Sequence, residues 1–207
     1  NTGHGTNVAG VAAGNIIGIA PNATILAVKV CNDDNPSTCT NADIASGIEW
    51  CIQYKDDYNI SVISMSFGSA SSYSTSNPCV SSVFDVDLAN ATSNGIALIA
   101  AAGNTVKTDG IAHPACNANV TAAGSVDKTD VLTHSRSDLL DFVAPGVSIN
   151  TTDYLGGFSS VTGTSFATPT ISGAIALLLE YKDRESSETL NKTQYENALK
   201  KCNYKYK

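Results

Sequence analysis

With 207 residues and 43% hydrophobic content, the chain is long enough to bury a substantial core, and we expect a single domain over residues 1–207. Its formal net charge of −7 argues against nucleic acid or an anionic membrane as the main partner, because both are negatively charged. No apolar run reaches membrane-spanning length, since the run 171–179 is short and contains Ser172 and Gly173.

Short β-branched runs alternate along the chain with longer amphipathic segments. Strands that alternate with helices indicate an α/β fold with a mostly parallel, twisted sheet and helices on both faces. In chain order, we expect helices at 6–13, 41–58, 80–94 and 165–181, and strands at 25–30, 61–65, 96–101, 119–125 and 140–143.

The second expected helix carries the clearest boundary signals. Asn41 and Asp43 are residues that cap helix beginnings. Gly95 follows the third helix, where glycine is favoured beyond a helix end. The buried face of the second helix is predicted to contain Ile44, Ile48, Cys51 and Ile52.

Ser165 lies between small residues at the beginning of the expected helix 165–181. A helix N-terminus favours negative charge, and small neighbours let a substrate backbone come close. A serine hydroxyl is a weak nucleophile unless a base lies beside it. The position suits a nucleophile that generates an oxyanion, and the alternative is a serine that caps a helix.

Two further blocks supply groups that such a nucleophile needs. His4 lies between glycines at the start of a helix of small residues, and Asn104 follows the strand 96–101 and Gly103. Taken alone, His4 is a histidine at a helix start and Asn104 is a turn asparagine. Together with Ser165 they provide a nucleophile, a general base and an amide donor, which are three parts of an acyl-transfer site.

In this order the blocks resemble the subtilisin-type serine protease family, the subtilases. Residues 4–10 match the family motif His-Gly-Thr-x-Val-Ala-Gly, and residues 101–104 match Ala-Ala-Gly-Asn. Residues 163–169 match Gly-Thr-Ser-Met-Ala-x-Pro, with Phe166 in place of methionine. The resemblance covers nearly the whole chain, with shorter matches at 18–23, 27–30, 47–50, 64–68 and 143–146.

The resemblance implies a three-layer subtilisin-like fold and a serine endopeptidase that hydrolyses peptide bonds. In that family pattern Ser165 forms the acyl-enzyme, His4 is the general base, and Asn104 donates to the oxyanion beside the Ser165 amide. No cofactor is required for this chemistry.

Two segments resemble the walls of the family's primary specificity pocket, along which a peptide adds as a strand. Their small side chains suggest room for an apolar or aromatic residue, and the pocket floor is expected near Ala112 and His113. The alternative is that both segments are plain buried strand ends. The expected substrate-binding residues are Ser66, Phe67, Gly68, Ala101, Ala102, Gly103 and Thr164.

One part of the family pattern does not occur among these residues. The family triad has an aspartate in an Asp-Ser/Thr-Gly turn before the histidine, but no Asp precedes His4, and Asp109-Gly110 lacks the middle residue. We interpret the chain as an internal fragment, truncated at both ends, whose sheet has a gap. We expect the fragment to be inactive or very weak, and the longer protein to contain the aspartate and an N-terminal propeptide.

Two other functions compete with this interpretation. The first is a catalytically dead binding domain on the same fold, a pseudo-protease, if the longer protein lacks the upstream aspartate. The intact His4, Ser165 and Asn104 argue against such decay. The second is a protease specialised for the maturation of partner proteins. If the protein is a peptidase, whether general or specialised, its partner is a peptide or protein substrate. We expect such an enzyme to be a monomer.

Six cysteines fit an oxidising compartment and hence a secreted or extracytoplasmic protein. Cys31 and Cys39 flank a loop-forming run, so a local disulfide is plausible on spacing, whereas a bond between Cys79 and Cys116 is implied by some subtilisin-like proteases. Cys51 is expected to be a buried thiol, and Cys202 has no assignment. A zinc site is the rival explanation, but the paired spacing it needs does not occur.

Metal binding has weak support in the sequence. The family's calcium loop after the histidine helix corresponds to residues 13–18, which carry almost no side-chain oxygen, so no metal ligand is assigned. Asp33, Asp34 and Asp43 are acidic loop candidates for a structural calcium ion, with a solvated loop as the alternative.

The histidine His134 lies in a polar stretch and is expected to be solvated.

Overall fold

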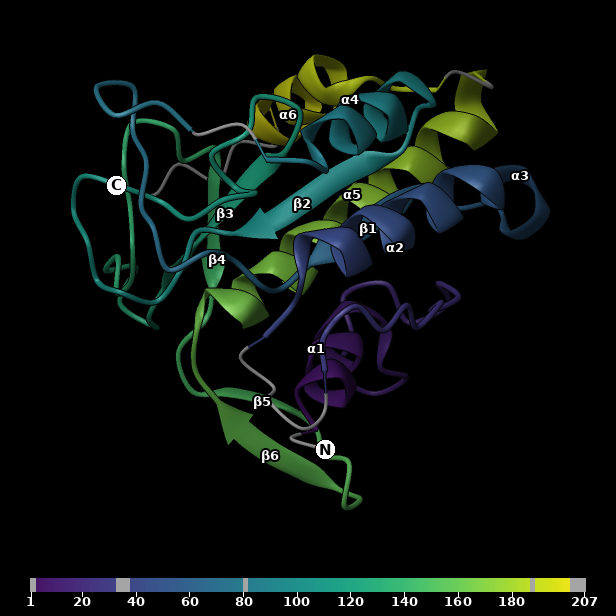
Figure 1. The fold of residues 1–207 in the computed structure, drawn as a ribbon. Coiled ribbons are helices and arrows are strands. Elements are labelled where there is room, and N and C mark those ends of the chain that lie inside the picture. Colours follow the sequence, from purple (N-terminus) through teal and green to yellow (C-terminus); the bar gives the residue numbers. More distant parts are fainter. Residues whose placement is uncertain (1–2, 33–37, 80–81, 187–188, 202–207) are drawn as a thin grey trace.

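The computed structural model describes residues 3–32, 38–79, 82–186 and 189–201. Its centre is a four-stranded, entirely parallel sheet in the order β1-β2-β3-β4 (Figure 1). Each strand lies within two residues of its expected start and end, because apolar β-branched runs mark the sheet interior. The strands are β1 (Val62–Met65), β2 (Ala97–Ala101), β3 (Thr121–Val126) and β4 (Phe142–Pro145).

Helices cover both faces of this sheet, which gives the three layers. Alternate residues of a strand point to opposite faces. Leu98 of β2 therefore packs with α2 (Asn41–Gln53) and α4 (Asp85–Ser93), whereas Ile99 packs with α5 (Thr164–Ser186). The expected mostly parallel, three-layer α/β architecture is confirmed.

The expected strand at 25–30 is wrong. This segment contains no strand, and Ile25, Leu26 and Val28 are between 36% and 47% exposed. Its β-branched residues fit a strand, but a strand also needs a hydrogen-bonded neighbour. In the described sheet β1 is an edge strand, and the segment does not join it as a further strand. Val28 and Val30 line the same cleft as Val62 of β1. The gap that we expect in the sheet stays a prediction.

Three boundaries differ from expectation in detail. Thr40, not Asn41, caps α2, and its hydroxyl accepts a hydrogen bond from the Asp43 amide at 3.1 Å. The expected helix 41–58 breaks at Tyr54 into α2 and the short α3 (Lys55–Tyr58). The helix α4 begins at Asp85, and residues 80–81 of the expected helix 80–94 lie outside the described residues.

A hairpin that the sequence analysis did not include supports the first helix. Strands β5 (Ile149–Thr152) and β6 (Phe158–Val161) pair antiparallel beside α1 (His4–Ala13) in the lower part of Figure 1. The Thr151 hydroxyl donates to the Asn7 carbonyl at 2.7 Å, and the Thr152 hydroxyl donates to the Thr6 carbonyl at 2.8 Å. These bonds hold the helix that begins with His4.

We expect Gly10→Ala to destabilise the full-length protein by about 1–3 kcal/mol. A Cβ at Gly10 would lie 2.1 Å from Thr152 Oγ1 and 2.6 Å from Thr151 Oγ1, so both hydroxyls would have to leave the helix. Gly5→Ala in the same helix is the matched control, because its Cβ would meet nothing within 4 Å. Urea unfolding midpoints measure the effect, and equal midpoints for the two variants would contradict it.

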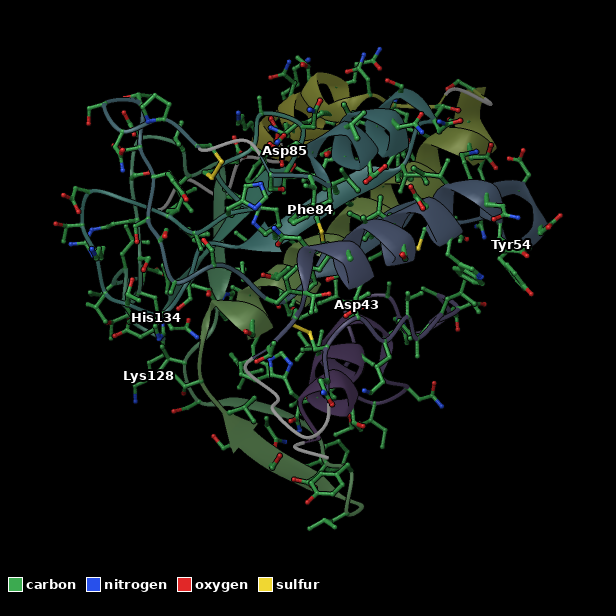
Figure 2. The ribbon with its side chains drawn as sticks, in the orientation of Figure 1. Asp43, Tyr54, Phe84, Asp85, Lys128 and His134 are labelled. Atoms are coloured by element: carbon green, nitrogen blue, oxygen red, sulfur yellow. A yellow bond between two sulfur atoms is a disulfide. The ribbon has the colours of Figure 1, made fainter. Side chains whose placement is uncertain are left out.

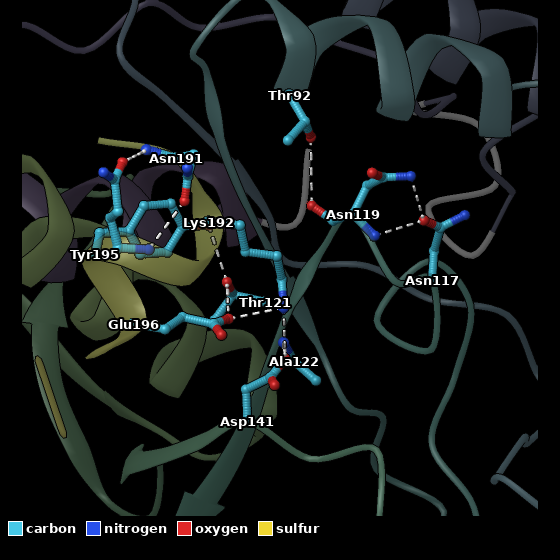
Figure 3. Close-up of polar contacts among 11 residues, drawn as sticks. Thr92, Asn117, Asn119, Thr121, Ala122, Asp141, Asn191, Lys192, Tyr195 and Glu196 are labelled. Atoms are coloured by element: carbon cyan, nitrogen blue, oxygen red, sulfur yellow. Dashed lines mark hydrogen bonds and ion pairs between the residues drawn. The ribbon is translucent and has the colours of Figure 1, made fainter. Parts of the chain in front are cut away.

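The helix α6 (Lys192–Lys201), also absent from the sequence analysis, is held by a polar cluster (Figure 3). Thr121 of β3 donates to the Glu196 carboxylate at 2.8 Å, and Lys192 lies 2.8 Å from the same oxygen. Tyr195 is 2% exposed, and burial raises the pKa of its hydroxyl to about 12. The cluster joins α6 to the sheet.

Two disulfides join loops, Cys31–Cys39 and Cys79–Cys116, and Cys51 is a buried free thiol. Cys202 lies outside the described residues.

Within the described ranges, no helix combines the length and the apolar character that a membrane crossing requires.

Candidate active site

Ser165 is the second residue of α5, directly beyond the sheet. Its hydroxyl donates to the Ser66 carbonyl at 3.2 Å, and the Ser66 hydroxyl donates to the Ser165 carbonyl at 2.8 Å. This reciprocal pair fixes the beginning of α5 against the segment that follows β1. The first amides of a helix have no acceptor within it, so the Ser165 N–H is available to a ligand at the positive end of the helix dipole.

Thr164 orients the side chain of Asn104. The Thr164 amide and hydroxyl both donate to Asn104 Oδ1, each at 2.9 Å. The Gly103 amide in turn donates to the Thr164 hydroxyl at 3.2 Å. With Oδ1 occupied by these donors, the amide nitrogen Nδ2 of Asn104 is the part of the side chain left to donate to a ligand.

Gly163 makes room for that amide nitrogen. Its φ of 151° lies in the region that favours glycine, and a Cβ built on it would approach Asn104 Nδ2 to 3.1 Å. The glycine therefore keeps a side chain away from Nδ2. Together with the free amide of Ser165 at the start of α5, this donor is of the kind that stabilises an oxyanion.

His4 is the first residue of α1, after Gly3 in a left-handed conformation. Its ring contacts the Phe166 ring edge-on, with centroids 5.8 Å apart, which places His4 at the N-terminus of α5. Burial lowers the pKa of the His4 imidazole below its usual value, and this favours the neutral form that a general base needs. In the described part of the chain, no hydrogen bond joins His4 to Ser165.

These residues line one cleft of about 1810 Å³. Of the expected substrate-binding residues, Ala102 does not reach the cleft, because it is fully buried and its carbonyl accepts the Ala112 amide at 2.9 Å. Ala112 does line the cleft, whereas His113 does not. The expected residues that line it are His4, Ser66, Phe67, Gly68, Ala101, Gly103, Asn104, Thr164 and Ser165.

The cleft continues away from Ser165 along the open edge of β1. Its lining there includes the apolar residues Val28, Val30, Ile60 and Val62. Gly47 of α2 also lines it, and a Cβ there would lie 2.6 Å from Val30 Cγ1. An open sheet edge beside such a cleft is suited to an added strand.

The other two histidines have contacts that the sequence did not indicate. His134 is half-buried rather than fully solvated, with Nδ1 2.6 Å from Ser125 Oγ and 2.9 Å from Thr133 Oγ1. Burial lowers the pKa of its imidazole. His113 contacts Asp85 and Phe84, which Figure 2 labels at the beginning of α4.

Of the three acidic loop candidates for calcium, only Asp43 lies among the described residues. Asp43 accepts a hydrogen bond from the Thr40 hydroxyl at 2.6 Å as part of the α2 cap. Asp33 and Asp34 lie outside the described residues. Among the residues that the structure does describe, no three His, Cys, Asp or Glu side chains gather as a metal-binding group.

Comparison with known proteins decides the family. A model of the subtilase family matches residues 1–206. The chain belongs to the subtilase family. Among similar proteins, the thermostable alkaline protease of Halalkalibacterium halodurans is 36% identical over 198 residues, which are 92% of this chain and 50% of that protein. The major intracellular serine protease of Bacillus subtilis is 34% identical over 203 residues, which are 93% of this chain and 60% of that protein.

A solved structure supports the subtilase assignment. The chain resembles a cold adapted subtilisin-like serine proteinase with a TM-score of 0.81 and 29% identity, over 97% of this chain and 67% of that one. The subtilase described here thus spans about half to two thirds of the length of these relatives.

Proposed function

We propose that the full-length protein is a serine endopeptidase that forms an acyl-enzyme on Ser165. The observation that carries this proposal is the meeting of Ser165, His4 and Asn104 in one cleft, from elements far apart in the sequence. Taken alone, Ser165 could cap a helix, His4 could be a residue at a helix start, and Asn104 could be a turn residue. These roles do not explain why the three residues meet in one cleft.

In the proposed reaction, His4 accepts the proton of the Ser165 hydroxyl as Oγ attacks the substrate carbonyl carbon. The carbonyl oxygen becomes an oxyanion that accepts hydrogen bonds from the Ser165 amide and Asn104 Nδ2. The C–N bond then breaks as His4 returns the proton to the leaving amine. Water attacks the acyl-enzyme with His4 again as base, which releases the acid and restores Ser165. For the first step, the Ser165 hydroxyl must exchange its bond to the Ser66 carbonyl for one to His4.

The substrate would lie as an extended strand between two wall segments, 66–68 and 101–103. The side chain before the scissile bond would point between Gly68 and Gly103 towards Ala112. Glycine walls and an alanine floor favour an apolar or aromatic side chain at this position. Two small walls leave room for a flat ring.

A carboxylate that orients His4 is the remaining part of the proposal. As the family pattern implies, we propose that it belongs to an aspartate that is not among these 207 residues. In a related triad, loss of the correct carboxylate lowers kcat by about 10⁴-fold. The 207 residues alone are therefore proposed to be inactive or very weak.

A secreted or extracytoplasmic location is proposed from the two disulfides, which persist in oxidising compartments. The family alone does not fix the compartment, since one of the relatives above is named intracellular. A monomeric enzyme and an N-terminal propeptide belong to the same proposal, and a structural calcium ion stays unassigned to any residue.

A fluorogenic peptide assay on the purified full-length protein tests the proposal. We expect hydrolysis that a fluorophosphonate abolishes and that a metal chelator does not abolish acutely. A folded protein that has an intact upstream region but hydrolyses no peptide would instead favour the pseudo-protease. Cleavage at a single motif in substrate profiling would favour a maturation protease.

Asn104→Ala is expected to lower kcat by about 10²–10³-fold with little change in KM, because the oxyanion forms only after substrate has bound. Thr164→Val retains the amide donor to Asn104 Oδ1 but loses the hydroxyl donor, so it should lower kcat by a smaller factor. Steady-state kinetics on one peptide measure both effects. A raised KM with unchanged kcat in Asn104→Ala would contradict the assigned role.

A further inference from the structure

His113 makes a buried polar contact on the far side of the pocket floor. Its Nε2 donates to Asp85 Oδ1 at 2.7 Å, a length typical of a charge-assisted hydrogen bond. His113 is 7% exposed, and its ring packs on Phe84 with centroids 4.9 Å apart. The imidazole is thus fixed at one nitrogen and on one face, away from the cleft.

Asp85 is itself fixed. It is the first residue of α4, where the helix dipole favours a carboxylate (Figure 2). The Ser82 amide donates to Asp85 Oδ2 at 3.2 Å, and the Ser82 hydroxyl donates to Asp85 Oδ1 at 3.1 Å. Because α4 packs against the core beside β2, the carboxylate is a rigid anchor for His113.

The backbone of His113 connects this anchor to the pocket. The Ser69 amide donates to the His113 carbonyl at 2.8 Å, and the His113 amide donates to the Ser69 hydroxyl at 3.1 Å. The adjacent Ala112 Cβ would lie 2.9 Å from a Cβ at Gly68 and 3.3 Å from one at Gly103. The position of the 112–113 backbone therefore sets the distance between the floor and both walls.

We infer that Asp85 and His113 are positioning residues that set the depth of the primary specificity pocket. This inference rests on the proposed peptidase function. Removal of the Asp85 carboxylate leaves a buried imidazole N–H without its acceptor, so the ring must turn towards water and move the 112–113 backbone. The floor then rises or tilts between the walls, while Ser165, His4 and Asn104 keep their contacts.

A disulfide limits the effect of losing the Asp85–His113 contact to the pocket floor. The disulfide Cys79–Cys116 joins the same two segments that Asp85 and His113 join, and the Cys116 amide donates to the Ala112 carbonyl at 3.0 Å. Loss of the Asp85–His113 contact therefore leaves the loop attached. The expected consequence is altered selection of the side chain in the pocket rather than loss of the fold.

The test compares Asp85→Ala with Asp87→Ala in the full-length protein, because both substitutions remove a carboxylate from the first turn of α4. Two peptides that differ only in Phe or Ala before the scissile bond serve as substrates. For Asp85→Ala we expect KM for the Phe peptide to rise about tenfold, with kcat and the Ala peptide nearly unchanged. Asp87→Ala should resemble wild type with both peptides.

A second pair of variants covers the case in which Asp85→Ala does not fold. His113→Gln retains an amide N–H that can reach Asp85 and should preserve the preference for Phe. His113→Phe retains the packing on Phe84 but not the donor and should lose that preference.

Each outcome decides the inference. Equal effects on the Phe and Ala peptides, or no difference between His113→Gln and His113→Phe in an active enzyme, would overturn it while the proposed function stands. A wild-type protein that hydrolyses neither peptide would overturn the proposed function and this inference together.

Discussion

We expect Ser165→Ala to lower kcat for peptide hydrolysis by about 10⁶-fold, the magnitude known for the corresponding change in subtilisin. The substitution removes the oxygen that forms the acyl-enzyme, and the other hydroxyl at the beginning of α5, that of Thr164, already donates to Asn104 Oδ1. The oxyanion donors remain, so a residual rate above that of the uncatalysed reaction should persist. Fluorogenic peptide hydrolysis by the purified full-length variant measures the loss.

Ser172→Ala is the matched control for this variant. It removes a hydroxyl from the same helix, two turns away, where the Ser172 hydroxyl donates to the Thr168 carbonyl at 2.9 Å. Its rate should stay within a few-fold of wild type. A Ser165→Ala enzyme that retains a tenth of the wild-type kcat would remove Ser165 from the mechanism.

We expect His4→Ala to be nearly as damaging, also about 10⁶-fold in kcat, because the base and the nucleophile act as one unit. For the same reason, the double variant His4→Ala with Ser165→Ala should be no slower than either single variant. Additive losses would show that the two residues act separately. His134→Gln changes another histidine with a lowered pKa; it is the control and should leave kcat within a few-fold.

The pH dependence of kcat/KM gives the same assignment an independent test. An imidazolium cannot accept the Ser165 proton, so activity should fall as the pH drops through the His4 pKa. Burial alone places that pKa below the usual value, and a carboxylate beside the ring would raise it. The fall of kcat/KM at low pH should therefore occur at a higher pH in a protein that contains the carboxylate. The residual activity of His4→Ala should not show this fall.

The parallel sheet could be predicted because β2 is apolar on both faces and its neighbours contain no charged residue. The runs that contain Ile63 and Ile99 stand out from their polar surroundings, and helices between them require parallel crossovers. The segment 25–30 has a similar composition but does not join the sheet that the described residues form. The sequence pattern records the preference of a segment for a strand, and the pairing depends on what lies beside it in space.

The hairpin β5–β6 and the helix α6 were missed for a different reason. Ser and Thr dominate the hairpin, so its alternation carries almost no apolar signal. The helix α6 is mostly polar, and its attachment depends on Thr121, Lys192 and Glu196, which meet only in the folded chain. Long-range polar contacts of this kind leave no periodic pattern.

The sequence motifs identified the functional side chains of the site, and the structure shows which residues hold them in place. His4, Asn104 and Ser165 could be chosen from local sequence because small residues surround each of them. The double donation from Thr164 to Asn104 could not, because the two residues are 60 positions apart. The Asp85–His113 contact behind the pocket was hidden for the same reason.

The most direct test of the account is to react the full-length protein with a fluorophosphonate and to map the modified residue by mass spectrometry of its peptides. Only a serine activated by a neighbouring base reacts quickly with this reagent. We predict a single adduct on Ser165 that is absent from His4→Ala. An adduct on another residue, or peptide hydrolysis by a protein that forms no adduct, would contradict the assignment of Ser165 as the nucleophile.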